Sequence, residues 1–210
     1  MIITEARRRR RSLYLLVLDG QEGPTVDVRT FDESAYRVGG GISEDQRDAL
    51  LELSEYNRAR ERALYLLGLR DYACKELTKK LLTEARPEIA ERVVARLADV
   101  GLLDDERYAE RLAHSLSRSK QYPKRRVAQE LARRGVDRET ANLAAEEIEC
   151  EDFEQALALI EKKYYNKMTD RDSRQKVMAA LARRGFSYEA IRRAMTVYDK
   201  NFEETESEWL

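Results

Sequence analysis

The sequence predicts a mainly α-helical protein, in which tandem three-helix repeats stack into an elongated array behind a small N-terminal β-hairpin. Three observations favour this class. Charged residues make up 38% of the 210 residues, above the ~25% of ordinary soluble domains. Apolar residues recur at helical spacing from about residue 43 to about residue 200. A short motif also recurs in this helical part. Such a chain buries one stripe of each helix, so thin cores shared between neighbours are expected.

The N-terminal 42 residues differ from the rest and predict the hairpin. Residues 13–18 form a short apolar run, and residues 25–29 alternate apolar with polar side chains. Arg7–Arg11 precede the first of these segments, and we expect a disordered basic arm or a polar lead-in to the first strand. Residues 39–41 are three glycines, which we interpret as a flexible joint. Because an isolated hairpin is marginally stable, it must dock on the helices or on a partner.

Capping signals mark the helix boundaries. Ser43-Glu44-Asp45-Gln46 has the pattern of a capping box. Asp104, Asp137 and Ser187 are well placed as N-caps, and a glycine that favours left-handed backbone precedes each of them by two or three residues. The acidic run that begins at Asp104 is therefore interpreted as a helix start and not as a metal site. We expect nine helical segments after residue 55, grouped in threes.

Internal similarity supports the grouping. Residues 130–136 (ELARRGV) recur 50 residues later as residues 180–186 (ALARRGF), and residues 76–81 (ELTKKL) are a weaker copy. An amphipathic helical pattern follows each copy, as expected of stacked repeats. The predicted organisation is residues 1–42 as the basic arm and hairpin, 43–102 as a linking helix and the first repeat, 103–150 as the second repeat, 151–202 as the third repeat, and 203–210 as an acidic tail.

The residue types needed for catalysis or metal binding are not gathered into any recognisable pattern. His114 is the only histidine, and Cys74 and Cys150 are far apart without ligand spacing. A glycine-rich phosphate loop is also missing. We therefore expect no enzyme, no catalytic or metal-binding residues and no cofactor. Since the chain has neither an apolar run of membrane-spanning length nor the pattern of an export signal, we expect it in the cytoplasm.

Charge is segregated along the chain although the net charge is only −1. Residues 118–138 carry eight basic and two acidic side chains, whereas residues 139–154 carry seven acidic and no basic ones. Such bands favour polyanions or charged proteins as partners, but they are also typical of solvated helix faces that balance one another. The candidate contact residues for a partner or DNA are Lys124, Arg125, Arg126, Arg133, Arg134, Arg183 and Arg184.

Several segments carry a family likeness. Residues 101–109 (GLLDDERYA) resemble the Gly-Tyr-Leu-(Asn/Asp)-Asp-x-x-(Phe/Tyr)-Ala signature of the RecX family of bacterial recombinase regulators. Residues 63–70 and 76–81 resemble the first family repeat, and residues 181–187 together with Ile191 resemble the third. The chain departs from the family at Ala73, where a serine usually caps the helix, so a weak cap or one moved to Asp71 is expected. The resemblance implies a curved array of three-helix repeats without catalytic residues.

The resemblance also implies a partner and a role. Members of the family bind filaments of the recombinase RecA on single-stranded DNA and limit their growth or promote their disassembly, which would restrain homologous recombination, DNA repair and the SOS response. Basic faces of a monomer could also touch the single-stranded DNA, and no membrane is involved. Two alternatives stay open: a helical regulator that binds DNA directly, and a helical-repeat scaffold without nucleic-acid contact. A duplex reader needs one base-reading helix, whereas the basic residues here are spread over separate repeats.

Overall fold

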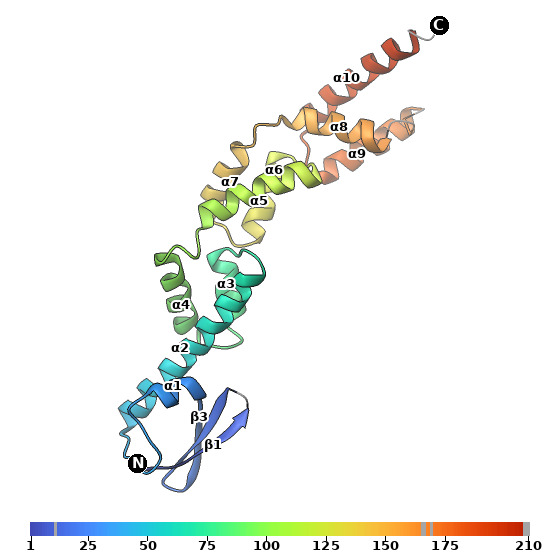
Figure 1. Ribbon diagram of the computed structural model, residues 1–210. Coiled ribbons are helices and arrows are strands. Elements are labelled where there is room, and N and C mark those ends of the chain that lie inside the picture. The colour runs from blue at the N-terminus through green and yellow to red at the C-terminus, as the bar shows by residue number, and fades with distance from the viewer. Residues whose placement is uncertain (11, 165–166, 169, 208–210) are drawn as a thin grey trace. The chain divides into compact units, whose positions relative to one another are not determined.

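A computed structural model describes the chain except for residues 11, 165–166, 169 and 208–210, and for residues 200–207 it describes the backbone alone. The described residues form three strands and ten helices in two compact units, Met1–Leu103 and Asp104–Leu210 (Figure 1). The strands are β1 (Ile3–Arg10), β2 (Leu13–Leu18) and β3 (Gln21–Asp27). The helices are α1 (Val28–Glu33), α2 (Glu44–Leu69), α3 (Cys74–Leu81), α4 (Pro87–Asp99), α5 (Asp105–Lys120), α6 (Lys124–Arg133), α7 (Arg138–Glu146), α8 (Asp152–Tyr164), α9 (Arg171–Arg184) and α10 (Tyr188–Ser207). The mainly helical class is confirmed, and no helix in the described part is long and apolar enough to cross a membrane.

The N-terminal sheet has three antiparallel strands in the order β1-β2-β3. The predicted hairpin is present as β2 and β3, and β1 adds a third strand that was not predicted. Of the two interpretations of the basic run, the disordered arm is wrong, because Arg7–Arg10 belong to β1 (Arg11 lies outside the described residues). An edge strand with one solvated face accepts charged side chains. On that face Arg7 binds Glu5 and Glu22, and the stems of such long side chains shield apolar neighbours from water.

The sheet docks on its own helices. Its inner face packs against Phe31 and against Leu50 of α2, in a core that includes Ile3 and Leu16. The backbone N–H of Asp27 donates to Ser54 Oγ at 2.7 Å, which fixes the end of β3 on α2. The expectation of a flexible glycine joint is wrong: Gly39 N–H donates to Ile3 O at 2.8 Å, and Ile3 N–H donates to Gly40 O at 2.9 Å. These bonds extend the edge of the sheet.

Helix α2 connects the sheet to the first three-helix group in one continuous run (Figure 1). It begins at the predicted capping box, where Ser43 Oγ accepts from Gln46 N–H at 3.2 Å and the Gln46 side chain accepts from Ser43 N–H at 2.9 Å. Its second half packs with α3 and α4 around a core that contains Ala63, Leu77 and Val93. Helix α3 has no side-chain cap at Ala73, as the departure from the family pattern predicted.

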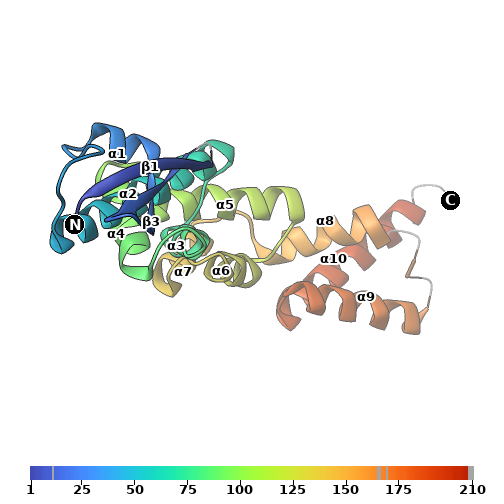
Figure 2. The same ribbon diagram turned by 90° about the horizontal axis from the view of Figure 1, so that it is seen from below.

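The second unit consists of two further three-helix groups, α5–α7 and α8–α10. The predicted N-caps are confirmed: Asp104 accepts from Arg107 N–H at 2.9 Å, Asp137 accepts from Thr140 N–H at 3.0 Å, and Ser187 Oγ accepts from Ala190 N–H at 3.1 Å. Helices α8 and α10 lie side by side and share a core with α9 that is built around Leu159, Leu181 and Ile191 (Figure 2). The backbone of α10 continues to Ser207, so most of the predicted acidic tail is helical.

Candidate functional site

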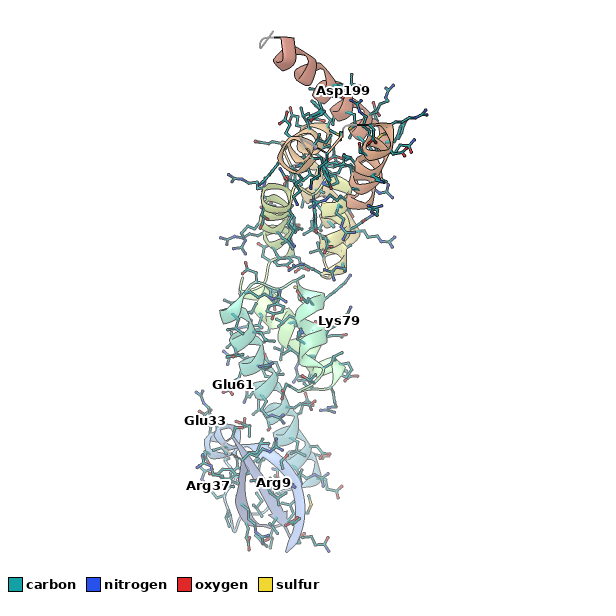
Figure 3. The ribbon with its side chains drawn as sticks, turned by 90° about the vertical axis from the view of Figure 1, so that its right-hand side faces the viewer. Arg9, Glu33, Arg37, Glu61, Lys79 and Asp199 are labelled. Carbon is teal, nitrogen blue, oxygen red and sulfur yellow. The ribbon has the colours of Figure 1, made fainter. Side chains whose placement is uncertain are left out.

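The repeated motif occupies the same place in each three-helix group, at the end of the second helix. The second residue of each copy is a leucine, Leu77, Leu131 or Leu181, and each of these leucines is 0% exposed. Because the leucine faces the core, the basic residue two positions later points away from it. The exposed residues at that position are Lys79, Arg133 and Arg183; Figure 3 shows Lys79 at the surface of the first group. A cation there also interacts favourably with the carbonyl end of its helix, so the motif has a structural role independent of any partner.

Two of the predicted contact residues are held by a nearly buried carboxylate. Glu130, whose side chain is 12% exposed, accepts from Arg126 Nη2 at 3.0 Å and from Arg133 Nη2 at 2.8 Å and Nε at 3.0 Å. Burial by itself would raise the pKa of Glu130. The hydrogen bond and charge of Arg133, with the charges of Arg126 and Arg134, outweigh burial and hold this pKa below its ordinary value. The positive charges of Arg126 and Arg133 are therefore partly neutralised inside the protein.

The N-terminus of α6 is occupied by the protein's own side chains. Lys124 N–H donates to Asp152 Oδ1 at 3.0 Å, and Lys124 Nζ donates to Glu146 O at 2.9 Å. A helix N-terminus favours anions, and here the anion is a carboxylate from α8. Lys124 thus fixes α6 against the end of α7 and the start of α8.

The remaining four predicted contact residues differ in burial and in whether their side chains have partners within the protein. Arg134 is half-buried, with Nη1 at 3.5 Å from the hydroxyl oxygen of Tyr108. Arg125, Arg183 and Arg184 have no hydrogen bond or ion pair from their side chains among the described residues. Arg125 and Arg183 are also exposed, whereas Arg184 is partly buried. The structure therefore divides the candidate set into charges with internal partners and charges that are available to a partner.

The side chains that could bind a metal ion or act in catalysis do not cluster in the described structure. In the parts of the chain that the structure describes, no three histidine, cysteine or acidic side chains converge to hold a metal ion. His114 is exposed on α5, and Cys74 and Cys150, both of intermediate burial, are not disulfide-bonded in the described structure. Burial raises the pKa of the Cys150 thiol, which lowers its thiolate fraction and hence its reactivity.

Sequence reasoning located the basic side chains but missed their internal partners. Glu130 stands three and four residues from Arg133 and Arg126, a spacing that places opposite charges side by side on a helix. That signal was present in the sequence. The Lys124–Asp152 contact joins residues 28 apart in different helices, and no local spacing indicates it.

The fold and the surface define the class of this molecule as a helical-repeat protein that carries an exposed basic side chain at a recurring position. Family models match two of its groups: the second three-helix domain of RecX at residues 104–144, and the third three-helix domain of RecX at residues 149–195. Regulatory protein RecX of Clostridioides difficile strain 630 is 30% identical over 176 residues, which cover 80% of this chain and 82% of that relative. Regulatory protein RecX of Stenotrophomonas maltophilia strain R551-3 is 37% identical over 141 residues, covering 66% and 85%.

This chain belongs to the RecX family of regulatory proteins. The resemblance noted in the sequence is thereby confirmed. A crystal structure of a regulatory protein RecX superposes with a TM-score of 0.66 at 22% identity and covers 93% of this chain and 98% of that one. The crystal structure of RecX from Lactobacillus salivarius gives a TM-score of 0.62, also at 22% identity, over 70% of this chain and 98% of that one. Both likenesses establish the fold.

Proposed function

We propose that this protein binds RecA filaments on single-stranded DNA and limits recombinase activity by blocking filament extension or promoting disassembly. It acts by binding and without catalysis, as a monomer in the cytoplasm. Its membership in a family of regulatory proteins supports the regulatory part of this role. The observation that carries the choice of partner is a set of arginines whose side chains have no hydrogen bond or ion pair in the part of the chain that the structure describes, Arg125, Arg183 and Arg184.

A RecA filament on single-stranded DNA is a suitable partner for a surface with exposed arginines on several repeats. It presents the same protein surface repeatedly beside a polyanion, so a protein made of similar repeats can engage several protomers with similar contacts. Linked contacts of this kind gain avidity even when each one is weak. Contacts to the phosphates of the single strand would make the affinity fall with rising salt. In this proposal Arg125 and Arg183 lead the contact set, while Lys124, Arg126 and Arg133 contribute less because they already have partners.

The test is the rate of DNA-dependent ATP hydrolysis by RecA from the same organism, measured on single-stranded DNA with this protein well below the RecA concentration. A fall in the rate is expected, because a few molecules at filament ends or in the groove would control many protomers. An unchanged rate, with RecA shown to be active alone, would refute the regulator. Sequence-preferential binding to duplex in a gel shift would then favour a direct DNA binder, and no binding to DNA or filament would favour a scaffold.

A charge reversal at Arg183 tests whether this residue contacts the filament. Arg183→Glu should weaken the inhibition, since Arg183 is exposed and has no internal partner in the described structure. Arg192→Glu is the matched control, because it makes the same charge change on an exposed residue of the same three-helix group outside the repeated motif. Equal effects of the two variants would mean that net charge, and not this contact, controls filament binding.

A further inference from the structure

A groove of about 410 Å³ runs between α6 and α7 in the second three-helix group. Three alanines line it, Ala128 and Ala132 from α6 and Ala141 from α7, the last 1% exposed. Alanine at these positions leaves a hollow between two packed helices into which a row of side chains from another helix can fit. The sequence did not predict this groove, although small residues recur on α6 and α7 at spacings of three and four residues.

Polar side chains rim this groove. Arg125 and Gln129 belong to α6, and Arg138 and Asn142 belong to α7. All four are exposed. Among the described residues none of the four side chains has a hydrogen bond or an ion pair, and no carboxylate lines the groove. Two guanidinium groups and two carboxamides are thus available on both sides of an alanine floor.

The chemistry of the rim selects the occupant. A guanidinium presents paired N–H donors that match the two oxygens of a carboxylate, and such charge-assisted bonds are stronger than neutral ones. Surfaces that bind single-stranded nucleic acid combine positive charge with aromatic side chains on which the bases stack. No aromatic side chain lines this groove. A helix with a small apolar face flanked by carboxylates is complementary to the alanine floor and to the arginines on either side.

We propose that the α6–α7 groove binds an acidic amphipathic helix of the partner protein, with Arg125 and Arg138 pairing to its carboxylates from opposite sides. This assignment rests on the proposed function, since it names the chemistry by which the second three-helix group would recognise a protein surface of the filament. It also separates the protein contact of this group from its contact with DNA.

The experiment measures fluorescence anisotropy of a labelled synthetic peptide helix titrated with the full chain. The peptide is about four turns long, or roughly 14 residues, with alanine and leucine on one face and glutamates flanking it. A peptide with lysine in place of each glutamate and a labelled oligothymidylate are titrated in parallel. The acidic peptide is expected to bind saturably, and the lysine peptide is expected not to bind.

Three variants test the contacts, and a fourth serves as their control. Arg125→Glu and Arg138→Glu should each weaken peptide binding by about tenfold, the equivalent of one charge-assisted hydrogen bond. Arg118→Glu, on an exposed residue of α5 outside the groove, makes the same charge change and should alter binding less than about twofold. Ala132→Trp fills the groove without changing the charge and should abolish peptide binding. Because Ala132 is exposed, this variant is expected to fold, which circular dichroism checks.

Each alternative result overturns the assignment. Failure of the wild-type chain to bind the acidic peptide, or equal binding of both peptides, would exclude it. Peptide binding that survives Ala132→Trp would place the contact elsewhere. Oligothymidylate binding that is lost in Arg125→Glu and in Ala132→Trp would assign the groove to nucleic acid. If the groove variants still inhibit RecA ATP hydrolysis, this inference fails while the regulator stands; if the wild-type chain does not inhibit, the proposed function fails whatever the peptide result.

Discussion

Replacing Glu130 by glutamine should make the protein less stable and its surface more attractive to polyanions. The carboxylate of Glu130 is nearly buried and accepts three N–H groups from Arg126 and Arg133. An exposed ion pair on a helix contributes only about 0.3–0.5 kcal/mol, but hydrogen bonds to a charged group contribute about 1.5–3 kcal/mol when they are desolvated. The carboxylate is 12% exposed, whereas the side chain of Arg133 is 73% exposed and that of Arg126 is 39% exposed. Each of the two ion pairs is therefore expected to contribute about 1 kcal/mol, between the exposed and the desolvated values, so that losing both costs about 2 kcal/mol.

Urea unfolding followed by circular dichroism measures this loss. Glu110→Gln is the matched control, since Glu110 is an exposed residue of α5 and the substitution removes the same charge. The control should change the free energy of unfolding by less than about 0.5 kcal/mol. A double-mutant cycle of Glu130→Gln with Arg133→Gln should show a coupling energy of about 1 kcal/mol. Equal midpoints for Glu130→Gln and the control would refute the reasoning.

The same substitution releases two arginines, so binding should respond in the opposite direction to stability. Each additional phosphate contact on single-stranded DNA steepens the dependence of log K on log salt by about 0.7. We expect Glu130→Gln to bind oligothymidylate more tightly at low salt and with a slope steeper by about 0.7 to 1.4. A variant that loses stability without any change in this slope would show that the released guanidinium groups do not reach the DNA.

The contribution of Glu130 to the free energy of unfolding should fall as the pH is lowered. Because the pKa of Glu130 lies below its ordinary value of 4.5 in the folded protein, its contribution to stability is fully present above pH 4.5 and is lost as pH falls through the folded pKa. The difference in free energy of unfolding between wild type and Glu130→Gln should therefore be constant near neutral pH and shrink below pH 4.5. Comparing the two proteins cancels the titration of the other carboxyl groups. A difference that grows on acidification would contradict the lowered pKa.

Two further predictions concern packing in the second unit. Gly185→Ala should destabilise more than Gly101→Ala, because both glycines have positive φ, 102° and 72°, but only at Gly185 would the added Cβ meet a neighbour, Arg126 Cβ at 3.1 Å. The shared backbone strain costs about 1–2 kcal/mol, and equal losses in thermal unfolding would mean that α6 yields to the added methyl group. Ser117→Ala should cost about 1–3 kcal/mol, because the buried amide of Gln155 donates to Ser117 Oγ at 2.6 Å and its own oxygen has no hydrogen-bond partner among the described residues. Adding Gln155→Leu should recover most of that loss, and a double variant less stable than Ser117→Ala would show that the amide has another essential contact.

Local signals predicted the helical part well. The capping box at Ser43 and the caps at Asp104, Asp137 and Ser187 depend on side chains within three residues of the helix start, so the sequence contains their geometry. The repeated motif placed three leucines in the cores for the same reason, because a period of 3.6 residues fixes which side chains share a face. The domain boundaries inferred from these signals stay a prediction.

The first strand was missed because its evidence is nonlocal. Arg7–Arg10 show no apolar alternation, and a strand of this composition persists only because its backbone pairs along β2 at the edge of the sheet. Register pairs such as Ile3 with Leu18 and Arg7 with Leu15 join residues that no spacing rule relates. The glycines at 39–41 were misread for the same reason, since their function is to bond to the end of that strand.

The charge bands have two roles that the structure separates. Part of the basic band is matched internally: Glu130 holds Arg126 and Arg133, and the acidic band supplies Asp152 and Glu146 to hold Lys124. A count of basic residues therefore overestimates the positive charge available to a partner. Arg125 lies within the same band but has no internal partner in the described structure. A reversal at Arg133 would place a second carboxylate beside Glu130 and perturb stability and binding together, whereas a reversal at Arg125 isolates binding. Charge reversals on this surface report on a partner only where the structure leaves the side chain free.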